Sequence, residues 1–132
     1  MKPSKGRTGQ RLTNKVKAYI AGLFDGEGCI WYSRTLRVSI TSCYPHHLQD
    51  IRDTFKFGQV RRVYKQGKNR RSCYRWETSG KYAEQFLEAI QEFLKEKQYQ
   101  AELGLRLGRH SPKTMTHSAI LRELKLLKKV NY

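Results

Sequence analysis

Two carboxylates, Asp25 and Glu27, lie among glycines in the stretch IAGLFDGEG, residues 20–28. The apolar residues before them have helical spacing, so both acids come at the C-terminal end of an expected helix. A helix C-terminus carries about half an elementary negative charge and repels carboxylates. Some further interaction must favour them there.

The charge of the whole chain points to a polyanionic partner. Among 132 residues, 27 are Lys or Arg and 11 are Asp or Glu, which gives a formal net charge of +16. Hydrophobic residues make up 38 % and charged residues 29 %, which is typical of a folded domain rather than a disordered chain. Nucleic acid is favoured over a membrane because no segment is apolar enough to span a bilayer. An acidic protein partner is the alternative.

The three cysteines, Cys29, Cys43 and Cys73, are odd in number and form no CxxC pair. They indicate reduced thiols in an intracellular protein that is not secreted, rather than a disulfide framework or a zinc ribbon. Residues 1–12 lack an apolar signal region and predict a basic, flexible arm. Residues 13–132 are expected to form a single domain.

Hydrophobic periodicity predicts helices and hairpins in alternation. Thr13 or Asn14 should cap the first helix, and Gly26 and Gly28 should end it. Apolar residues then alternate with polar ones, as in strands that bury one face. The expected elements are a hairpin of 30–34 with 36–41, a helix over 45–55, a hairpin of 60–65 with 72–78, and helices over 81–94, 97–107 and 120–129. This order predicts an α+β domain with a curved antiparallel sheet whose second face is exposed.

Arginines and aromatic residues are concentrated in the second predicted hairpin, VRRVYKQGKNRRSCYRW, and we expect them to share its solvent face. A basic ribbon of this kind has the shape to enter the major groove of DNA, where arginine suits guanine edges. The polar strand positions predicted to contact DNA are Arg34, Arg37, Ser39, Thr41, Gln59, Arg61, Arg70, Arg71, Tyr74 and Arg75.

The stretch IAGLFDGEG resembles the LAGLIDADG motif of homing endonucleases. Five of its nine residues are identical and four are conservative departures; the identical ones are Ala21, Gly22, Leu23, Asp25 and Gly28. The element order over 16–107 resembles the αββαββα core of that family, and FLKEKQYQAELGL resembles a basic segment near the end of its single-motif members, such as those encoded in group I introns.

A single motif implies a homodimer, because the family pairs two such helices. The small residues Ala18, Ala21 and Gly22, with Asp25, would let the helix of a second copy approach closely. Close packing inside one monomer is the alternative for these small residues. Asp25 is expected mainly to cap backbone groups and to form hydrogen bonds at the interface.

The resemblance also implies a site for metal-dependent catalysis. The family's metal ligands fall on the carboxylate of Glu27 and the carbonyl of Gly26, with Mg²⁺ or Mn²⁺ as the ion. The family's active-site lysine falls on Lys97, for which a solvated surface lysine is the alternative. Ser42 takes the place of a water-organising glutamine, and His46 the place of an arginine, although His46 could equally be a plain surface residue.

The function that follows is a homodimeric, site-specific endonuclease that cuts both strands of a long, nearly palindromic DNA duplex and serves intron or intein homing. Such a protein would work in an organelle such as a chloroplast or mitochondrion, or in a bacterial or phage-infected cytoplasm. Relatives that bind intron RNA as maturases, or that bind DNA as repressors without cutting it, are the alternatives.

Overall fold

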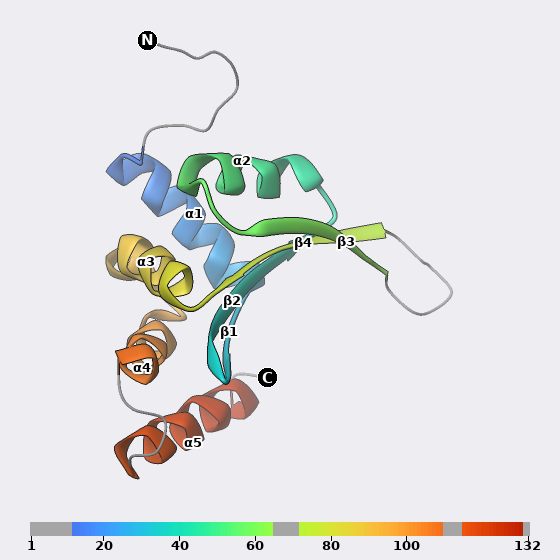
Figure 1. Cartoon of the computed structure of the whole chain (residues 1–132). Helices are drawn as coiled ribbons and strands as arrows, with labels where there is room; N and C mark the ends of the chain where they lie inside the picture. The colour runs from blue at the N-terminus through green and yellow to red at the C-terminus, as the bar shows by residue number, and fades with distance from the viewer. Residues whose placement is uncertain (1–11, 65–71, 110–114, 131–132) are drawn as a thin grey trace.

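The computed structural model describes residues 12–64, 72–109 and 115–130, and its elements follow the predicted order (Figure 1). The bounds are α1 Asn14–Glu27, β1 Gly28–Ser33, β2 Thr35–Ser42, α2 Pro45–Phe55, β3 Gln59–Tyr64, β4 Ser72–Ser79, α3 Lys81–Ile90, a 3₁₀ turn Gln91–Phe93, α4 Gln98–Arg109 and α5 Met115–Val130. The predicted α+β core of αββαββα order is confirmed. The arm over residues 1–11 lies outside the described residues.

The strands of the described residues form one antiparallel sheet in the order β1-β2-β4-β3. The hairpins meet at its centre, where β2 pairs with β4 and Ile40 lies opposite Trp76. Helices α1, α2, α3 and α4 pack on one side of this sheet, and the other side carries no described helix (Figure 1). We call that side the open face.

The core fills the space between the sheet and these helices. Helix α1 buries Ile20, Ala21 and Phe24 against it, and Trp76 of β4 is fully buried. The indole nitrogen of Trp76 donates to the carbonyl of Phe57 at 3.2 Å, so the largest buried side chain has its polar atom satisfied.

Local sequence accounts for the ends of several elements. The Thr13 hydroxyl accepts from the backbone N–H of Val16 at 3.3 Å, which confirms the predicted cap of α1. Gly58 has a φ of +89°, and a side chain there would collide with the Trp76 indole, so the turn before β3 requires glycine. The predicted helix over 81–94 instead breaks after Ile90 into a 3₁₀ turn.

Helix α5 packs on α4 at the edge of the molecule near β1 (Figure 1). Its His117 is buried and lies edge-on to Tyr32 of β1, with 4.7 Å between ring centroids. Tyr99 of α4 donates its hydroxyl to Glu123 of α5. That hydrogen bond is the main cause that raises the pKa of Tyr99. None of the helices in the described ranges is long and apolar enough to cross a membrane.

Candidate active site and nucleic-acid interface

Asp25 uses its carboxylate to hold a distant part of the chain. The two oxygens accept from three consecutive backbone N–H groups, those of Lys95 at 2.8 Å, Glu96 at 3.2 Å and Lys97 at 3.0 Å. These residues lead directly into α4. The predicted capping role of Asp25 is therefore confirmed, and it explains why an acid is tolerated at the repulsive end of α1.

Lys97 completes the same junction. Its side chain is only 7 % exposed, and its ammonium donates to the carbonyl oxygen of Asp25 at 2.7 Å. A cation at a helix C-terminus is stabilised by the helix dipole. The backbone carbonyl of Lys97 accepts from the N–H of Ala101 at 2.8 Å, which is the first hydrogen bond of α4. Lys97 is therefore not a solvated surface lysine, and it lies against the end of α1 where the predicted site is placed.

Glu27 is arranged differently from Asp25, although the two are only two residues apart. It is the last residue of α1 and is exposed, and no hydrogen bond or ion pair within the described ranges engages its carboxylate. The carbonyl of Gly26 is among the last four of α1, and no N–H group within the helix is placed to donate to it. Folding of one chain therefore does not account for an acid at position 27.

The oxygens of Glu27 and Gly26 fit a hard divalent cation. Mg²⁺ binds proteins through one or two carboxylates and takes its other ligands from water and substrate phosphates. Among the described residues, no three His, Cys, Asp or Glu side chains gather into a metal cluster. One chain thus offers part of a coordination sphere, which suits an ion completed by a phosphate substrate.

Ser42 and His46 lie at the same end of the sheet as the motif. The register pairs Gly28 with Ile40, and Ser42 follows two residues later at the end of β2. The Ser42 hydroxyl accepts from the backbone N–H of Tyr44 at 3.0 Å, which shapes the turn into α2. His46 is exposed in the first turn of α2. No described contact joins either residue to Glu27, and their catalytic roles stay predictions.

The small residues of α1 divide between two sides of the helix. Ala18, Gly22 and Gly26 are exposed, and a Cβ added at either glycine would meet no atom within 4 Å. Ala21 is instead fully buried in the core. This burial fits the monomer-packing alternative, and the place of Ala21 in a dimer interface stays a prediction. That alternative does not explain Gly22 or Gly26.

The open face carries most of the predicted DNA contacts. Core residues such as Val38 and Trp76 face the helices, so the pleat turns the alternate positions outward. The predicted residues that share the open face are Arg37, Ser39, Thr41, Gln59, Arg61 and Arg75. Ser39 is only 4 % exposed, because its larger neighbours cover it. Arg70 and Arg71 lie outside the described residues.

Two predicted contacts lie elsewhere. Arg34 has a φ of 66° and occupies the turn between β1 and β2, so it belongs to the tip of the hairpin rather than to a strand. Tyr74 points to the opposite face of β4 from Arg75 and packs against the core. The Arg62 guanidinium lies 5.9 Å from the centre of the Tyr74 ring. The expectation that cations and aromatic residues of this hairpin share one solvent face is therefore wrong.

Sequence reasoning missed Trp31 and Glu77, which both lie on the open face. They help to line a hollow of about 400 Å³ that crosses the sheet, together with Arg37, Gly58, Gln59, Thr78, Ser79 and Tyr82. The alternation of Trp31 with the buried Ile30 could have revealed its side. Glu77 gave a misleading signal, since its charge argues against a surface that meets a polyanion.

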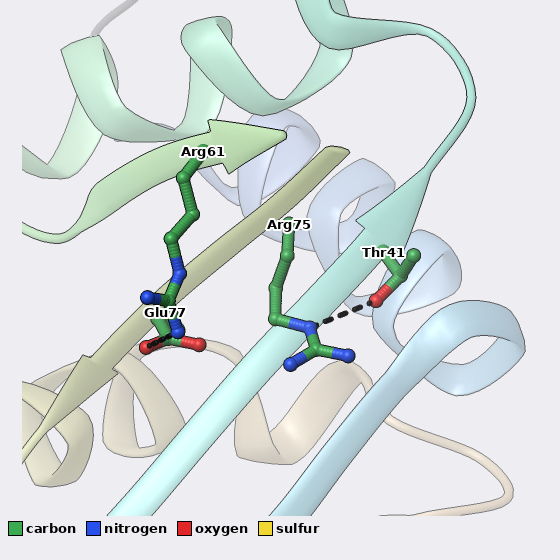
Figure 2. Close-up of polar contacts among 4 residues, drawn as sticks. All are labelled: Thr41, Arg61, Arg75 and Glu77. Atoms are coloured by element: carbon green, nitrogen blue, oxygen red, sulfur yellow. Dashed lines mark hydrogen bonds and ion pairs between the residues drawn. The ribbon is translucent and has the colours of Figure 1, made fainter. Parts of the chain in front are cut away.

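Few contacts join the open-face side chains to one another. Figure 2 shows Arg61 turned toward Glu77, with 2.9 Å between their nitrogen and oxygen, and Arg75 turned toward Thr41. The second contact, from Arg75 Nε to the Thr41 hydroxyl, measures 3.5 Å. Most donor groups of both guanidiniums therefore remain available to a ligand.

The cysteines are not joined by a disulfide in the described chain. The fold nevertheless brings the Cys43 and Cys73 sulfurs within 3.2 Å of each other, although they are 30 residues apart. No sequence pattern predicts this pair.

Comparisons with known proteins agree with this geometry. The family model of the LAGLIDADG-like domain matches residues 14–91. The homing endonuclease I-CvuI, solved in complex with its target, superposes with a TM-score of 0.70 at 22 % identity, over 86 % of this chain and 82 % of that one.

Two further DNA complexes share the fold. The archaeal intron-encoded homing endonuclease I-Vdi141I gives a TM-score of 0.67 at 17 % identity, over 86 % of this chain and 84 % of that one. The group I intron-encoded I-CeuI gives 0.54 at 17 %, over 80 % of this chain and 57 % of that one. No curated protein sequence matches the chain.

Proposed function

The chain belongs to the family of LAGLIDADG-like domains, and on that premise we propose that it is a site-specific DNA endonuclease that acts as a homodimer and requires a divalent cation. Its substrate would be a long, nearly palindromic duplex, cut in both strands. The structurally similar I-CvuI and I-Vdi141I were solved with DNA, which supports this substrate class.

The observation that carries the proposal is the contrast between two neighbouring acids. The carboxylate of Asp25 accepts hydrogen bonds from three backbone N–H groups. Glu27 is exposed beside the Gly26 carbonyl at the end of α1 and has no partner among the described residues. A carboxylate placed against DNA phosphates would be repelled unless a cation lay between them. Glu27 and the Gly26 carbonyl would hold that cation.

Such an ion, Mg²⁺ or Mn²⁺, supplies activation of water and neutralises charge at the scissile phosphate. Structures of I-CvuI were determined in the presence of Ca and of Mg, which supports divalent metal use. The protein's own part is positional. Lys97 would add positive charge at this end of α1 and, with Asp25, it ties the end of α1 to the start of α4.

The exposed side of α1 supports the dimer. Glycine inside a helix costs about 0.5–1 kcal/mol relative to alanine, yet Gly22 and Gly26 face open space within one chain. A second α1 packed against them would give the missing reason for their size. The twofold arrangement would place one Glu27 for each DNA strand.

The open face supports DNA binding, because Arg37, Arg61 and Arg75 project from it in a chain with a net charge of +16. It has no described helix over it (Figure 1). A two-hairpin platform of this kind can lie in a major groove and present side chains to base edges. RNA would be the substrate of the maturase alternative.

The test is cleavage of a randomised duplex DNA library, with new ends sequenced, in Mg²⁺, in Mn²⁺ and in EDTA. Glu27→Gln removes the proposed ligand while it keeps the side-chain size. Glu102→Gln, at an exposed position of α4, removes the same charge outside the motif and is the matched control.

We expect the wild type and the control to cut at one pseudo-palindrome in Mg²⁺ or Mn²⁺. We expect no cutting by either protein in EDTA, and none by Glu27→Gln in any sample. Loss of cleavage in Glu27→Gln should be on the order of a thousandfold. Sequence-selective binding without cut ends in any sample would contradict the nuclease and favour a repressor or maturase.

A further inference from the structure

An ion pair on the open face joins the edge strand β3 to β4, between Arg61 and Glu77 (Figure 2). The distance between Arg61 Nη2 and Glu77 Oε2 is 2.9 Å, and the two side chains are 58 % and 27 % exposed. The pair is thus solvent-accessible, and the carboxylate is the more covered partner.

Neither folding nor simple attraction to DNA explains Glu77. Exposed ion pairs contribute little to folding stability. A carboxylate on a surface that meets phosphates also opposes binding. Glu77 therefore lowers non-specific affinity for DNA, and a different role must account for its place on this face.

The register shows what Glu77 does to its neighbours. Arg61 lies directly opposite Arg75 on the paired strands, and Glu77 lies opposite Gln59. Two guanidiniums directly across an antiparallel pair repel each other. Glu77 draws Arg61 diagonally away from Arg75, while Arg75 turns the other way toward Thr41 (Figure 2).

We propose that Glu77 is a positioning residue for base recognition, and that it orients the Arg61 guanidinium to read one guanine in each half of the DNA target. The inference rests on the proposed DNA binding. Glu77 engages one edge of the Arg61 fork, and the other N–H donors remain available on a side chain that is more than half exposed. Guanine presents O6 and N7 to such a fork in the major groove.

The test is selection of bound sequences from a randomised duplex library, with the full chain in EDTA so that targets stay intact. The variants are Glu77→Gln, Arg61→Lys and the double variant, and Glu102→Gln is the charge-matched control. Thermal unfolding of each variant and affinity for an unrelated duplex are measured in parallel.

We expect the wild type to select a G·C pair at one position in each half-site. Preference at that position should fall about tenfold in Glu77→Gln, because a good bidentate contact is lost. Arg61→Lys should relax the same position, and the double variant should relax it no further, since both act on one contact. Affinity of Glu77→Gln for unrelated DNA should rise while its Tm stays within a degree or two of the wild type.

Two results would overturn the inference alone: a wild-type consensus that Glu77→Gln leaves unchanged, or relaxation of different positions by Glu77→Gln and Arg61→Lys. A wild type that selects no consensus would overturn the proposed DNA recognition as well, and this outcome is distinguishable because the wild type itself fails.

Discussion

The C-terminal end of α1 and the open face of the sheet hold their polar side chains in opposite ways. At the end of α1, Asp25 and Lys97 bind backbone groups at 2.7–3.2 Å, and Lys97 is nearly buried. On the open face, Arg61 pairs with an exposed carboxylate, and Arg75 reaches Thr41 only at 3.5 Å. The first region is built into the fold, and the second is largely free of it.

In the proposed function, the end of α1 serves catalysis and the open face serves DNA recognition, and the difference fits these two roles. Phosphodiester hydrolysis needs ligand atoms at set positions, and rigid backbone contacts provide them. A surface that reads DNA can exchange its side chains without unfolding the protein, because few of them support the core. Substitutions of Asp25 or Lys97 should therefore change stability, while those on the open face should change affinity and sequence preference.

The largest effect is expected from Gly22→Leu, on the exposed side of α1. Overpacking costs about 1–3 kcal/mol per site, and a twofold axis would double it. Dimer dissociation should thus become at least about 30-fold easier. The monomer should not be destabilised, because a Cβ at Gly22 meets nothing within 4 Å and leucine favours helix over glycine.

Sedimentation over a concentration series measures the dimer, and urea unfolding measures the monomer. Gln85→Leu, at an exposed position of α3, adds a leucine in place of a polar residue elsewhere on a helix. An unchanged dimer in Gly22→Leu would show that α1 is not the interface.

The next effect contrasts the two acids of the motif. Asp25→Ala should lower the free energy of unfolding by about 2–3 kcal/mol, since three N–H groups lose a charged acceptor. Glu27→Ala should change it by less than about 0.5 kcal/mol, because the side chain is exposed and has no described partner. Urea denaturation of both variants gives the two values. Equal losses would remove the basis for assigning metal to Glu27 alone.

The sequence predicts the parts of the fold and site whose interacting residues are close together along the chain. Helix ends, strand alternation and the motif are local patterns, and they predicted the order of elements and the cap at Thr13. The partner of Asp25 was out of reach, because Lys97 is 72 residues away. The same holds for Cys43 and Cys73, which only the pairing of β2 with β4 brings together.

On the open face the errors have a different origin. Tyr74 and Arg75 belong to one basic, aromatic run, yet a strand turns adjacent residues to opposite faces, so composition misled where the period of two would have separated them. Arg34 was predicted in a strand, but it lies in a tight turn that requires a positive φ. On α1, the small residues look alike in the sequence, and only the core shows that Ala21 is buried.

Arg37 tests the open face at intermediate strength. The guanidinium extends over β2 near Trp31, and its Nε donates to the Ser33 carbonyl at 3.4 Å. Arg37→Gln should lower the slope of log affinity against log salt concentration by about two units, because each of the two copies in the proposed dimer loses one phosphate contact. Fluorescence anisotropy with the selected duplex at several salt concentrations measures the slope. Arg106→Gln, exposed on α4, is the control and should leave the slope unchanged.

The smallest effect is expected from Thr41→Val, which keeps the shape of the side chain and removes the acceptor of Arg75. At 3.5 Å this contact is at the limit of a hydrogen bond, so the free energy of unfolding should change by less than about 0.5 kcal/mol. The base preference due to Arg75 should also hold, in contrast to the effect of Glu77→Gln on Arg61, because a weak contact does not fix the direction of an arginine. Urea unfolding and selection from the randomised library measure the two quantities. A tenfold change in preference on loss of this hydroxyl would mean that the open face is held as firmly as the end of α1, and the division between the two regions would fail.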